Sequence, residues 1–318
     1  MGAPPVSEWL QSVLCCPACA EKMAIEQAAL ACTNCGRRVP IRDGVPTFVE
    51  DAADEIGRRT QSSFGYEWQE FADWRPSGQQ NFESYFSGCD LDALAHADVL
   101  DAGCGMGRHA RFMAQRVARL IALDFSAAVE SARQNLREFE NVACVRADLR
   151  RLPFAPATFD FIYSLGVVHH IADTDGAVRA LADKLRPGGR LRIYVYWARQ
   201  GASGWLLRLV AAARTITTRM PFPLLRVACR ALSAALWVGI VGPYRALGAM
   251  GVDVSRWPLS VYTKYPFNVL YNDQFDRFSA PIEKRYTAQS ARKLLADAGL
   301  TDISVRECFG WVAEGRKP

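Results

Sequence analysis

The sequence predicts an α/β protein that is built around a parallel sheet. Across residues 91–198, short apolar runs alternate with segments of helical periodicity, as in repeated strand–helix–strand units. Half of the 318 residues are apolar and 22% are charged, which excludes a disordered chain and provides for a large core. The length suits two domains, or one large domain with an appendage.

Apolar runs in this region predict strands, and the segments between them predict helices. The expected strands cover residues 98–102, 119–123, 142–146, 159–164, 190–196 and 302–307. The expected helices cover residues 107–116, 126–138, 174–185 and 287–298, the last of which is stopped by Gly299.

Composition divides the chain into five regions. Around Asp43–Gly44 the sequence reads as a strand, a turn and a strand, and the aromatic side chains of Phe64, Tyr66 and Trp68 suit helices that cover a ligand. The regions are a cysteine-rich module (1–50), a linker with lid helices (51–90), the core (91–198), a helical insertion (199–280) and a C-terminal completion of the core (281–318).

The helical insertion belongs to a strongly basic stretch. From Lys184 to Val252 there is no Asp or Glu but eleven Lys and Arg, so the rest of the chain carries a net charge of −6. A basic segment in an acidic chain implies an anionic partner, which is phosphate, nucleic acid or lipid head groups.

The insertion is not expected to cross a membrane. Its longest uncharged run, residues 231–244, has fourteen residues and contains Gly239, Gly242 and Pro243, whereas a span needs about twenty. The arginine spacing instead predicts helices with one apolar and one basic face. Two interpretations follow for these helices. They form a cap over the active site, or they make a peripheral contact with a membrane through residues 205–245.

A glycine-rich loop carries the densest chemical signal. The run Asp-Ala-Gly-Cys-Gly-Met-Gly, from Asp101 to Gly107, follows an apolar strand and precedes a helix. Glycines allow sharp turns, and the N–H groups at the helix start favour an anionic or polar ligand. Arg108 replaces the last glycine of a dinucleotide fingerprint, and no Gly-Lys-Ser/Thr follows, so neither a dinucleotide loop nor a Walker loop is present.

Two further acids follow the next strands. Asp124 ends the second strand, 21 residues after Gly103, where it can accept hydrogen bonds from both ribose hydroxyls, and Phe125 offers a face for adenine. Asp148 follows the third strand, where it can accept from the adenine amino group.

Together these residues resemble the class I S-adenosylmethionine-dependent methyltransferases. The resemblance covers residues 97–198, including the runs 159–164 and 185–191. It implies a Rossmann-like seven-stranded sheet and S-adenosylmethionine as cofactor. In the family pattern the methionyl part is held by Asp101, Gly103, Cys104, Gly105 and Gly107, the ribose by Asp124, the adenine by Phe125, Asp148 and Leu149, and the rest of the donor pocket is lined by Leu165 and Gly166.

Four cysteines near the N-terminus have the spacing of a metal site. Two Cys-x-x-Cys pairs lie twelve residues apart, at Cys16 and Cys19 and at Cys32 and Cys35, which suits a tetrahedral structural zinc with no catalytic role. The module resembles the zinc ribbon of a methyltransferase activator. The N-terminus has no secretory pattern, so a reducing, cytoplasmic location is expected, peripheral at the membrane surface if the insertion makes that contact.

The candidate acceptor site follows the fourth strand. His169 and His170 stand where this fold faces the acceptor, so one of them is a candidate general base, or the pair packs against the sheet and shapes the pocket. Four more residues are candidates for contact with the acceptor: Tyr196, Asp276, Arg285 and Tyr286.

The function predicted from these features is methyl transfer to a small or lipid-like acceptor. O- or C-methylation is favoured over N-methylation, because Tyr163–Gly166 replaces the Asn/Asp-Pro-Pro-Tyr run that is common in amino-methylating members. RNA base methylation with the ribbon and the basic insertion is the alternative. It is disfavoured because residues 1–50 hold five acidic and four basic side chains. A module that binds the donor without transferring methyl is a third interpretation.

Overall fold

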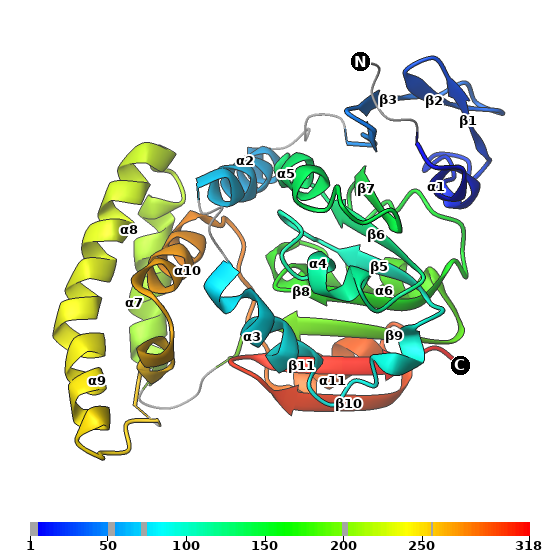
Figure 1. Ribbon diagram of the computed structural model, residues 1–318. Helices are drawn as coiled ribbons and strands as arrows, with labels where there is room; N and C mark the ends of the chain where they lie inside the picture. The colour runs from blue at the N-terminus through cyan, green and yellow to red at the C-terminus, as the bar shows by residue number, and fades with distance from the viewer. Residues whose placement is uncertain (1–5, 50–54, 71–74, 199–202, 256) are drawn as a thin grey trace. The chain divides into compact units, whose positions relative to one another are not determined.

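The computed structural model describes residues 6–49, 55–70, 75–198, 203–255 and 257–318 (Figure 1). The chain divides into two compact units. The first unit comprises Met1–Gln61, Trp74–Arg199 and Ile282–Pro318, and the second comprises Ser62–Asp73 and Gln200–Pro281.

A seven-stranded sheet forms the centre of the first unit. Its order is β10-β11-β9-β8-β5-β6-β7, in which β5 to β9 pair in parallel and β11 runs antiparallel to both of its neighbours (Figure 1). This confirms the predicted fold class. The strands are β5 (Asp98–Ala102), β6 (Arg119–Asp124), β7 (Val142–Arg146), β8 (Phe159–Leu165), β9 (Leu185–Val195), β10 (Thr301–Glu307) and β11 (Trp311–Arg316).

Helices cover both faces of this sheet, because its strands are apolar on both sides. Along β5, Val99 belongs to one core cluster and Leu100 to the other, as the alternation of side chains along a strand requires. The first face packs on α3 (Arg75–Phe86), α4 (Ala110–Ala114) and α5 (Ala128–Asn135). The second packs on α1 (Glu8–Val13), α6 (Thr174–Asp183) and α11 (Ala288–Ala296).

Two predicted boundaries are wrong for reasons of backbone geometry. The helix expected from residue 107 begins at Ala110, because Gly107 has a φ of +84° that no helix accepts. The strand expected from residue 190 begins at Leu185, because Gly188 N–H donates to Lys317 O and Lys317 N–H donates to Gly189 O. The chain end thus extends the pairing of β9.

Residues 6–49 form a small antiparallel sheet that joins the edge of the large one. The turn predicted at Asp43–Gly44 is confirmed by positive φ at both residues. Thr47 pairs with Arg146 of β7 in parallel, and Phe48 N–H donates to Arg146 O at 2.8 Å. The strands are β1 (Met23–Glu26), β2 (Ala29–Cys32), β3 (Arg38–Arg42) and β4 (Val45–Pro46).

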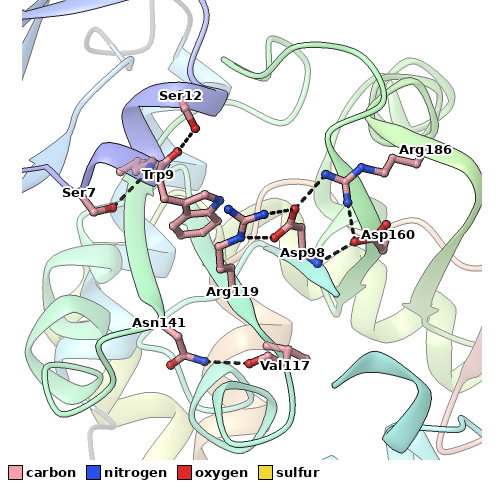
Figure 2. A network of polar contacts seen from close by, with 10 residues as sticks. Ser7, Trp9, Ser12, Asp98, Val117, Arg119, Asn141, Asp160 and Arg186 are labelled. Atoms are coloured by element: carbon pink, nitrogen blue, oxygen red, sulfur yellow. Dashed lines mark hydrogen bonds and ion pairs between the residues drawn. The ribbon is translucent and has the colours of Figure 1, made fainter. Parts of the chain in front are cut away.

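A charged network ties the strands together at the amino end of β5 (Figure 2). The buried Asp98 carboxylate accepts from Arg119 at 2.7 Å and from Arg186 at 2.9 Å. Arg186 also donates to Asp160 at 2.6 Å, and the Arg119 guanidinium lies 5.2 Å from the ring centre of Trp9 in α1. Four strands and the N-terminal helix therefore meet at one neutralised carboxylate.

The second unit is helical. Its core joins Leu225 and Cys229 of α8 to Tyr271 and Phe275 of α10, and Tyr66 of α2 stacks on Phe222 with ring centres 5.2 Å apart. The helices of this unit are the end of α2 (Glu55–Glu70), α7 (Ser203–Thr217), α8 (Phe222–Leu236), α9 (Gly242–Ala249), α10 (Phe267–Ser279) and the short η4 (Ser260–Lys264).

One helix in this unit is longer than the sequence analysis expected. Helical structure continues without a break over the 28 residues Phe222–Ala249, which are long and apolar enough to cross a membrane by length and composition alone. A π-helical turn, Trp237–Val241, joins α8 to α9, and Gly242 N–H donates to Trp237 O. This turn accommodates Pro243, which has no N–H to donate. The fourteen uncharged residues 231–244 are therefore part of a longer continuous helix, which the sequence analysis did not expect.

Candidate functional site

The glycine loop connects β5 to α4 at the carboxyl end of the parallel strands. Gly103, Gly105 and Gly107 all have positive φ, of +93°, +54° and +84°. A Cβ on Gly103 would lie 2.3 Å from the side chain of Val167, so only glycine fits there. The N–H groups of Gly103 and Cys104 both donate to Leu123 O, which holds the loop against β6.

Asp101 carries a buried carboxylate beside this loop. The side chain is 3% exposed, and its Oδ2 has no hydrogen-bond partner among the described residues. Burial raises the pKa of Asp101 to about 8; the charge of Asp124 adds to this shift, and Tyr163 and Arg108 oppose it. A buried carboxyl group with an unpaired oxygen and a raised pKa favours a ligand that brings a positive charge, such as an ammonium group.

Asp124 lies at the end of β6 and is held by three hydrogen bonds. Its Oδ2 accepts from Gly105 N–H at 2.8 Å, and its Oδ1 accepts from the N–H and the hydroxyl of Ser126 at 2.8 and 2.7 Å. Burial raises the pKa of Asp124, whereas these hydrogen bonds and the charge of Arg146 lower it. With about four acceptor sites on a carboxylate, one site remains on Oδ2 for a further donor.

Phe125, which follows Asp124, is anchored through its backbone. Its carbonyl accepts from Arg146 Nε at 3.3 Å and from Gln61 Nε2 at 3.4 Å. The main chain of Arg146 also pairs with residues 47–48. Arg146 therefore connects the small N-terminal sheet to the loop after β6 that contains Phe125.

The remaining predicted donor residues follow β7 and β8. The Asp148 carboxylate is paired with Arg150 at 2.6 Å, and Leu149 is buried. Gly166, next to Leu165, has a φ of +80°, and its N–H donates to Tyr194 O. Since β8, β5, β6 and β7 are successive neighbours in the sheet, the predicted donor residues lie along one edge.

His169 and His170 follow β8 on a short helix, η2 (Val168–His170), and their rings are in contact at a centroid distance of 4.2 Å. His170 Nδ1 lies 2.6 Å from the carbonyl of Ile282. Since a carbonyl only accepts, Nδ1 carries a proton, and in the neutral form of the ring Nε2 carries the lone pair. His169 is fully buried, and burial, with the charges of His170 and Arg285, lowers its pKa well below the usual value, so its ring is neutral.

Three of the four predicted acceptor residues come together beside these histidines. The Tyr196 ring centre is 4.1 Å from that of His169, and the Arg285 guanidinium lies 5.8 Å from the same tyrosine ring. Tyr286 N–H donates to Tyr196 O at 2.8 Å. Asp276 belongs to α10 in the second unit, so its predicted grouping with Arg285 and Tyr286 stays a prediction.

Other aromatic residues that the sequence analysis missed continue this cluster. Tyr85 of α3 contacts His109 and Tyr194, with ring centres 5.4 and 4.7 Å apart, and Tyr194 contacts Tyr196 at 5.9 Å. The sequence did contain one signal for this cluster. Tyr194 and Tyr196 are two residues apart, so on a strand their side chains lie on the same face. Of the predicted lid residues, Tyr66 packs within the second unit, and the side chains of Phe64 and Trp68 lie outside the described residues.

The four predicted metal ligands meet in the N-terminal sheet. The Sγ atoms of Cys16, Cys19, Cys32 and Cys35 all lie within 4.8 Å of one another. Cys35 N–H donates to Cys32 Sγ, as a tight Cys-x-x-Cys turn requires. Cys15 is not part of this cluster, and its backbone N–H donates to Pro153 O. Four thiolates at these separations can hold one tetrahedral metal ion.

Comparison with known families identifies the core of the first unit. Residues 100–193 match the family described as methyltransferase domain. The chain contains a class I S-adenosylmethionine-dependent methyltransferase domain. Human N-acetylserotonin methyltransferase in complex with S-adenosylmethionine has the same fold, with a TM-score of 0.50 and 15% identity over 84% of this chain and 60% of that chain.

Curated relatives of this methyltransferase domain are similar over part of their length. Methyltransferase GfsG of Streptomyces halstedii is 36% identical over 108 residues, which cover 32% of this chain and 39% of the relative. The ubiquinone biosynthesis O-methyltransferase of Idiomarina loihiensis is 32% identical over 135 residues, which cover 39% and 52%. The chain thus spans about half or less of the length of these two relatives.

Proposed function

We propose that this protein transfers a methyl group from S-adenosylmethionine to an oxygen or carbon atom of a small, lipid-like acceptor. The observation that carries the proposal is the tautomer of His170, whose Nδ1–H is fixed on Ile282 O so that Nε2 is the basic atom. The ring lies among the aromatic side chains of Tyr196 and its neighbours, a few residues after β8.

The donor is assigned to the glycine loop and the strand ends beside it. Gly103, Gly105 and Gly107, with Cys104, leave room for its methionyl part, and Asp101 has an unpaired oxygen for the ammonium group. The acceptor site that remains on Asp124 suits a ribose hydroxyl, and a second hydroxyl would share an oxygen with Gly105 N–H or Ser126. S-adenosylmethionine supplies, when bound, an electrophilic methyl group on a sulfonium sulfur. Phe125, Asp148, Leu149, Leu165 and Gly166 are assigned to the adenine and the rest of the pocket.

The chain's own chemistry in this proposal is proton removal and orientation. His170 Nε2 would take the proton from an acceptor hydroxyl or carbon acid while that oxygen or carbon bonds to the methyl carbon. The bond between the methyl carbon and the sulfonium sulfur would break in the same step, and its electron pair would remain on the sulfur of the departing thioether. The imidazolium that forms is stabilised by the carbonyl of Ile282, which already accepts from Nδ1. The contacting His169 ring positions His170 rather than reacting.

The aromatic cluster favours an apolar acceptor with a polar end. The rings of Tyr85, Tyr194 and Tyr196 are in mutual contact, and the guanidinium group of Arg285 lies over the last of them. The likeness to an O-methyltransferase of ubiquinone biosynthesis supports oxygen as the methylated atom.

Labelled donor tests the proposal. The protein is incubated with methyl-labelled S-adenosylmethionine and a fractionated cell extract, and we expect the label in the organic-soluble fraction. His170→Ala should lower the rate by about a hundredfold or more, with donor binding unchanged by calorimetry, because only the base is lost. The exposed His96→Ala is the control. Label in nucleic acid, or full activity of His170→Ala, contradicts the proposal.

RNA methylation is the second candidate function, and the basic insertion favours it. Residues 200–252 contain six arginines and no acidic residue. RNA that copurifies with the protein and is released steeply by salt would support this alternative. The excess of acidic over basic side chains in residues 1–50 opposes it.

We further propose that Cys16, Cys19, Cys32 and Cys35 hold a structural zinc ion. Because four thiolates fill a tetrahedral shell, the ion has no open position for chemistry. Metal analysis of the purified protein should give one zinc per chain, and a Cys16→Ser/Cys32→Ser variant should contain none and unfold at a lower temperature. A full zinc content in that variant would exclude this site.

A further inference from the structure

The helices of the second unit expose an unusual amount of apolar side chain. In the part of the chain that the structure describes, nine of the eleven exposed large hydrophobic side chains lie between residues 209 and 257. Val227 is 65% exposed, Val238 is 75% exposed and Ile216 is 69% exposed. Concentrations of this kind mark a surface that binds a partner or a membrane.

Three of these side chains and two exposed alanines form one continuous stripe along α8 and the π turn that follows it. Leu224, Val227, Ala231, Ala235 and Val238 are spaced by three or four residues, so they share one face of the helix, and all five are exposed. We call these five residues the outer face of α8. The opposite face packs on α10, with Leu225, Cys229 and Ser233 buried.

The charge around the outer face has a single sign. Six arginines and no acidic residue occur between Gln200 and Val252. Arg219 and Arg230 are exposed, and Arg230 follows the outer-face residue Val227 by three positions, which places it at the border of the stripe. An apolar stripe with Arg230 at its border, in a segment that has arginines and no acidic residue, complements a bilayer that carries anionic lipids.

From these observations we propose that the outer face of α8 docks on the surface of an anionic bilayer, with the helix lying in the plane of the head groups. Its apolar side chains then enter the acyl boundary, and Arg219 and Arg230 contact lipid phosphates.

The contacts on the other side of the helix favour lying on the membrane over crossing it. Cys229 Sγ and Tyr271 Oη hydrogen-bond across the α8–α10 interface, to Gln274 O and Arg226 O. Arg245 donates to the carbonyls of Thr263 and Tyr265. A helix that crossed the bilayer would lose these bonds and place Arg230 in hydrocarbon, whereas a helix on the surface retains all of them.

Vesicle flotation tests the docking. The full chain is mixed with vesicles of phosphatidylcholine alone, or of phosphatidylcholine with 30% phosphatidylglycerol, and the floating fraction is measured against lipid concentration. We expect binding to the anionic vesicles and little to the neutral ones. Arg219→Gln/Arg230→Gln should weaken the partition roughly 10- to 30-fold at low salt, since each arginine near an anionic surface contributes about 1 kcal/mol.

The apolar stripe is tested with a matched pair of variants. Val227→Glu/Val238→Glu should abolish flotation, because two charges enter the stripe, and both side chains are exposed enough for the fold to persist. Ile25→Glu/Phe309→Glu makes the same changes at the two exposed hydrophobic positions outside the second unit and should bind like the natural chain. Circular dichroism verifies that all variants keep their helix content.

Three results would overturn the proposal. The first is equal flotation of the two glutamate variants. The second is binding that resists both high salt and carbonate at pH 11, which would indicate a spanning helix. The third is a concentration-dependent dimer that uses this face without vesicle binding. None of these measurements involves methyl transfer, so the docking and the proposed reaction fail independently.

Discussion

Two buried aspartates stand three residues apart on β5, and their surroundings are opposite. Asp98, at the amino end, is neutralised by the guanidinium groups of Arg119 and Arg186. Asp101, at the carboxyl end, is equally buried but has an oxygen without a partner, and its pKa is raised to about 8. The same residue type on one strand is thus satisfied at one end and unsatisfied at the other.

This difference separates what holds the sheet together from what binds a ligand. Two cations offset the desolvation cost of a buried carboxylate, so the group is tolerated in the folded chain. Because its oxygens are occupied by these cations, it is not available to bind a ligand. A buried carboxylate without a cation destabilises the folded chain until a ligand supplies one. The amino end of β5 is therefore structural, and the carboxyl end is where the methyl donor is proposed to bind.

The largest expected effect is on stability at the amino end. Asp98→Asn leaves Arg119 and Arg186 without their shared carboxylate, and because both guanidinium groups are partly exposed we expect a loss of about 2–4 kcal/mol in the free energy of unfolding. Urea unfolding measures this. The exposed Asp92→Asn is the control and should change stability by less than about 0.5 kcal/mol. A loss no larger than that of the control would show that the network is dispensable.

At the carboxyl end the same substitution should act on binding instead. Asp101→Asn removes the charge for the donor's ammonium group, so affinity for S-adenosylmethionine should fall roughly 10- to 100-fold by calorimetry, the range of a charge-assisted hydrogen bond. Asp98→Asn, measured on folded protein, should bind the donor normally. If both variants bind alike, the assignment of Asp101 is wrong.

The pH dependence sharpens the contrast. The raised pKa of Asp101 means that the folded chain keeps a proton that the unfolded chain loses, so this group's contribution to stability falls as pH rises from about 4 to about 8. Donor binding needs the ionised form, so affinity should rise about tenfold from pH 6 to pH 7 and approach its maximum near pH 8. It should fall at higher pH, where the donor's ammonium group loses its proton. Asp101→Asn should flatten this rise, and a rise that persists in the variant would point to another group.

A smaller effect is expected from the link between the N-terminal sheet and the loop. Arg146→Gln removes the hydrogen bond to Phe125 O and the charge near Asp124, so donor affinity should fall roughly fivefold, with little change in melting temperature. Arg137→Gln, on an exposed arginine, is the control. Unchanged affinity for the donor would show that Arg146 contributes to the pairing at the sheet edge and not to donor binding.

Regular elements were predictable from the sequence because their signals are local. The strands 98–102 and 142–146 agree with β5 and β7 to the residue, since each is an apolar run between turns. The glycine loop and the four cysteines were equally visible, because spacing alone specifies them. The long helix Phe222–Ala249 was missed because a π turn, which no local pattern signals, carries it past Pro243.

The parts of the site that depend on distant residues could not be predicted. Arg186 and Asp98 are 88 positions apart, and Ile282, which fixes the tautomer of His170, is 112 positions away. The sequence analysis named both histidines but had no means to say which nitrogen is protonated. Likewise, Tyr85 entered the aromatic cluster only through tertiary packing against Tyr194.

The pairing of residues 47 and 48 with β7 has one more consequence. β7 is the last strand of the large sheet on that side, and the carbonyl of its last residue, Arg146, accepts from Phe48 N–H of the N-terminal module. Without that module, the edge would offer free amides and carbonyls to any extended peptide, including another molecule of the same kind. The module therefore covers part of this edge with its main chain, so the cover does not depend on which side chains residues 47 and 48 carry.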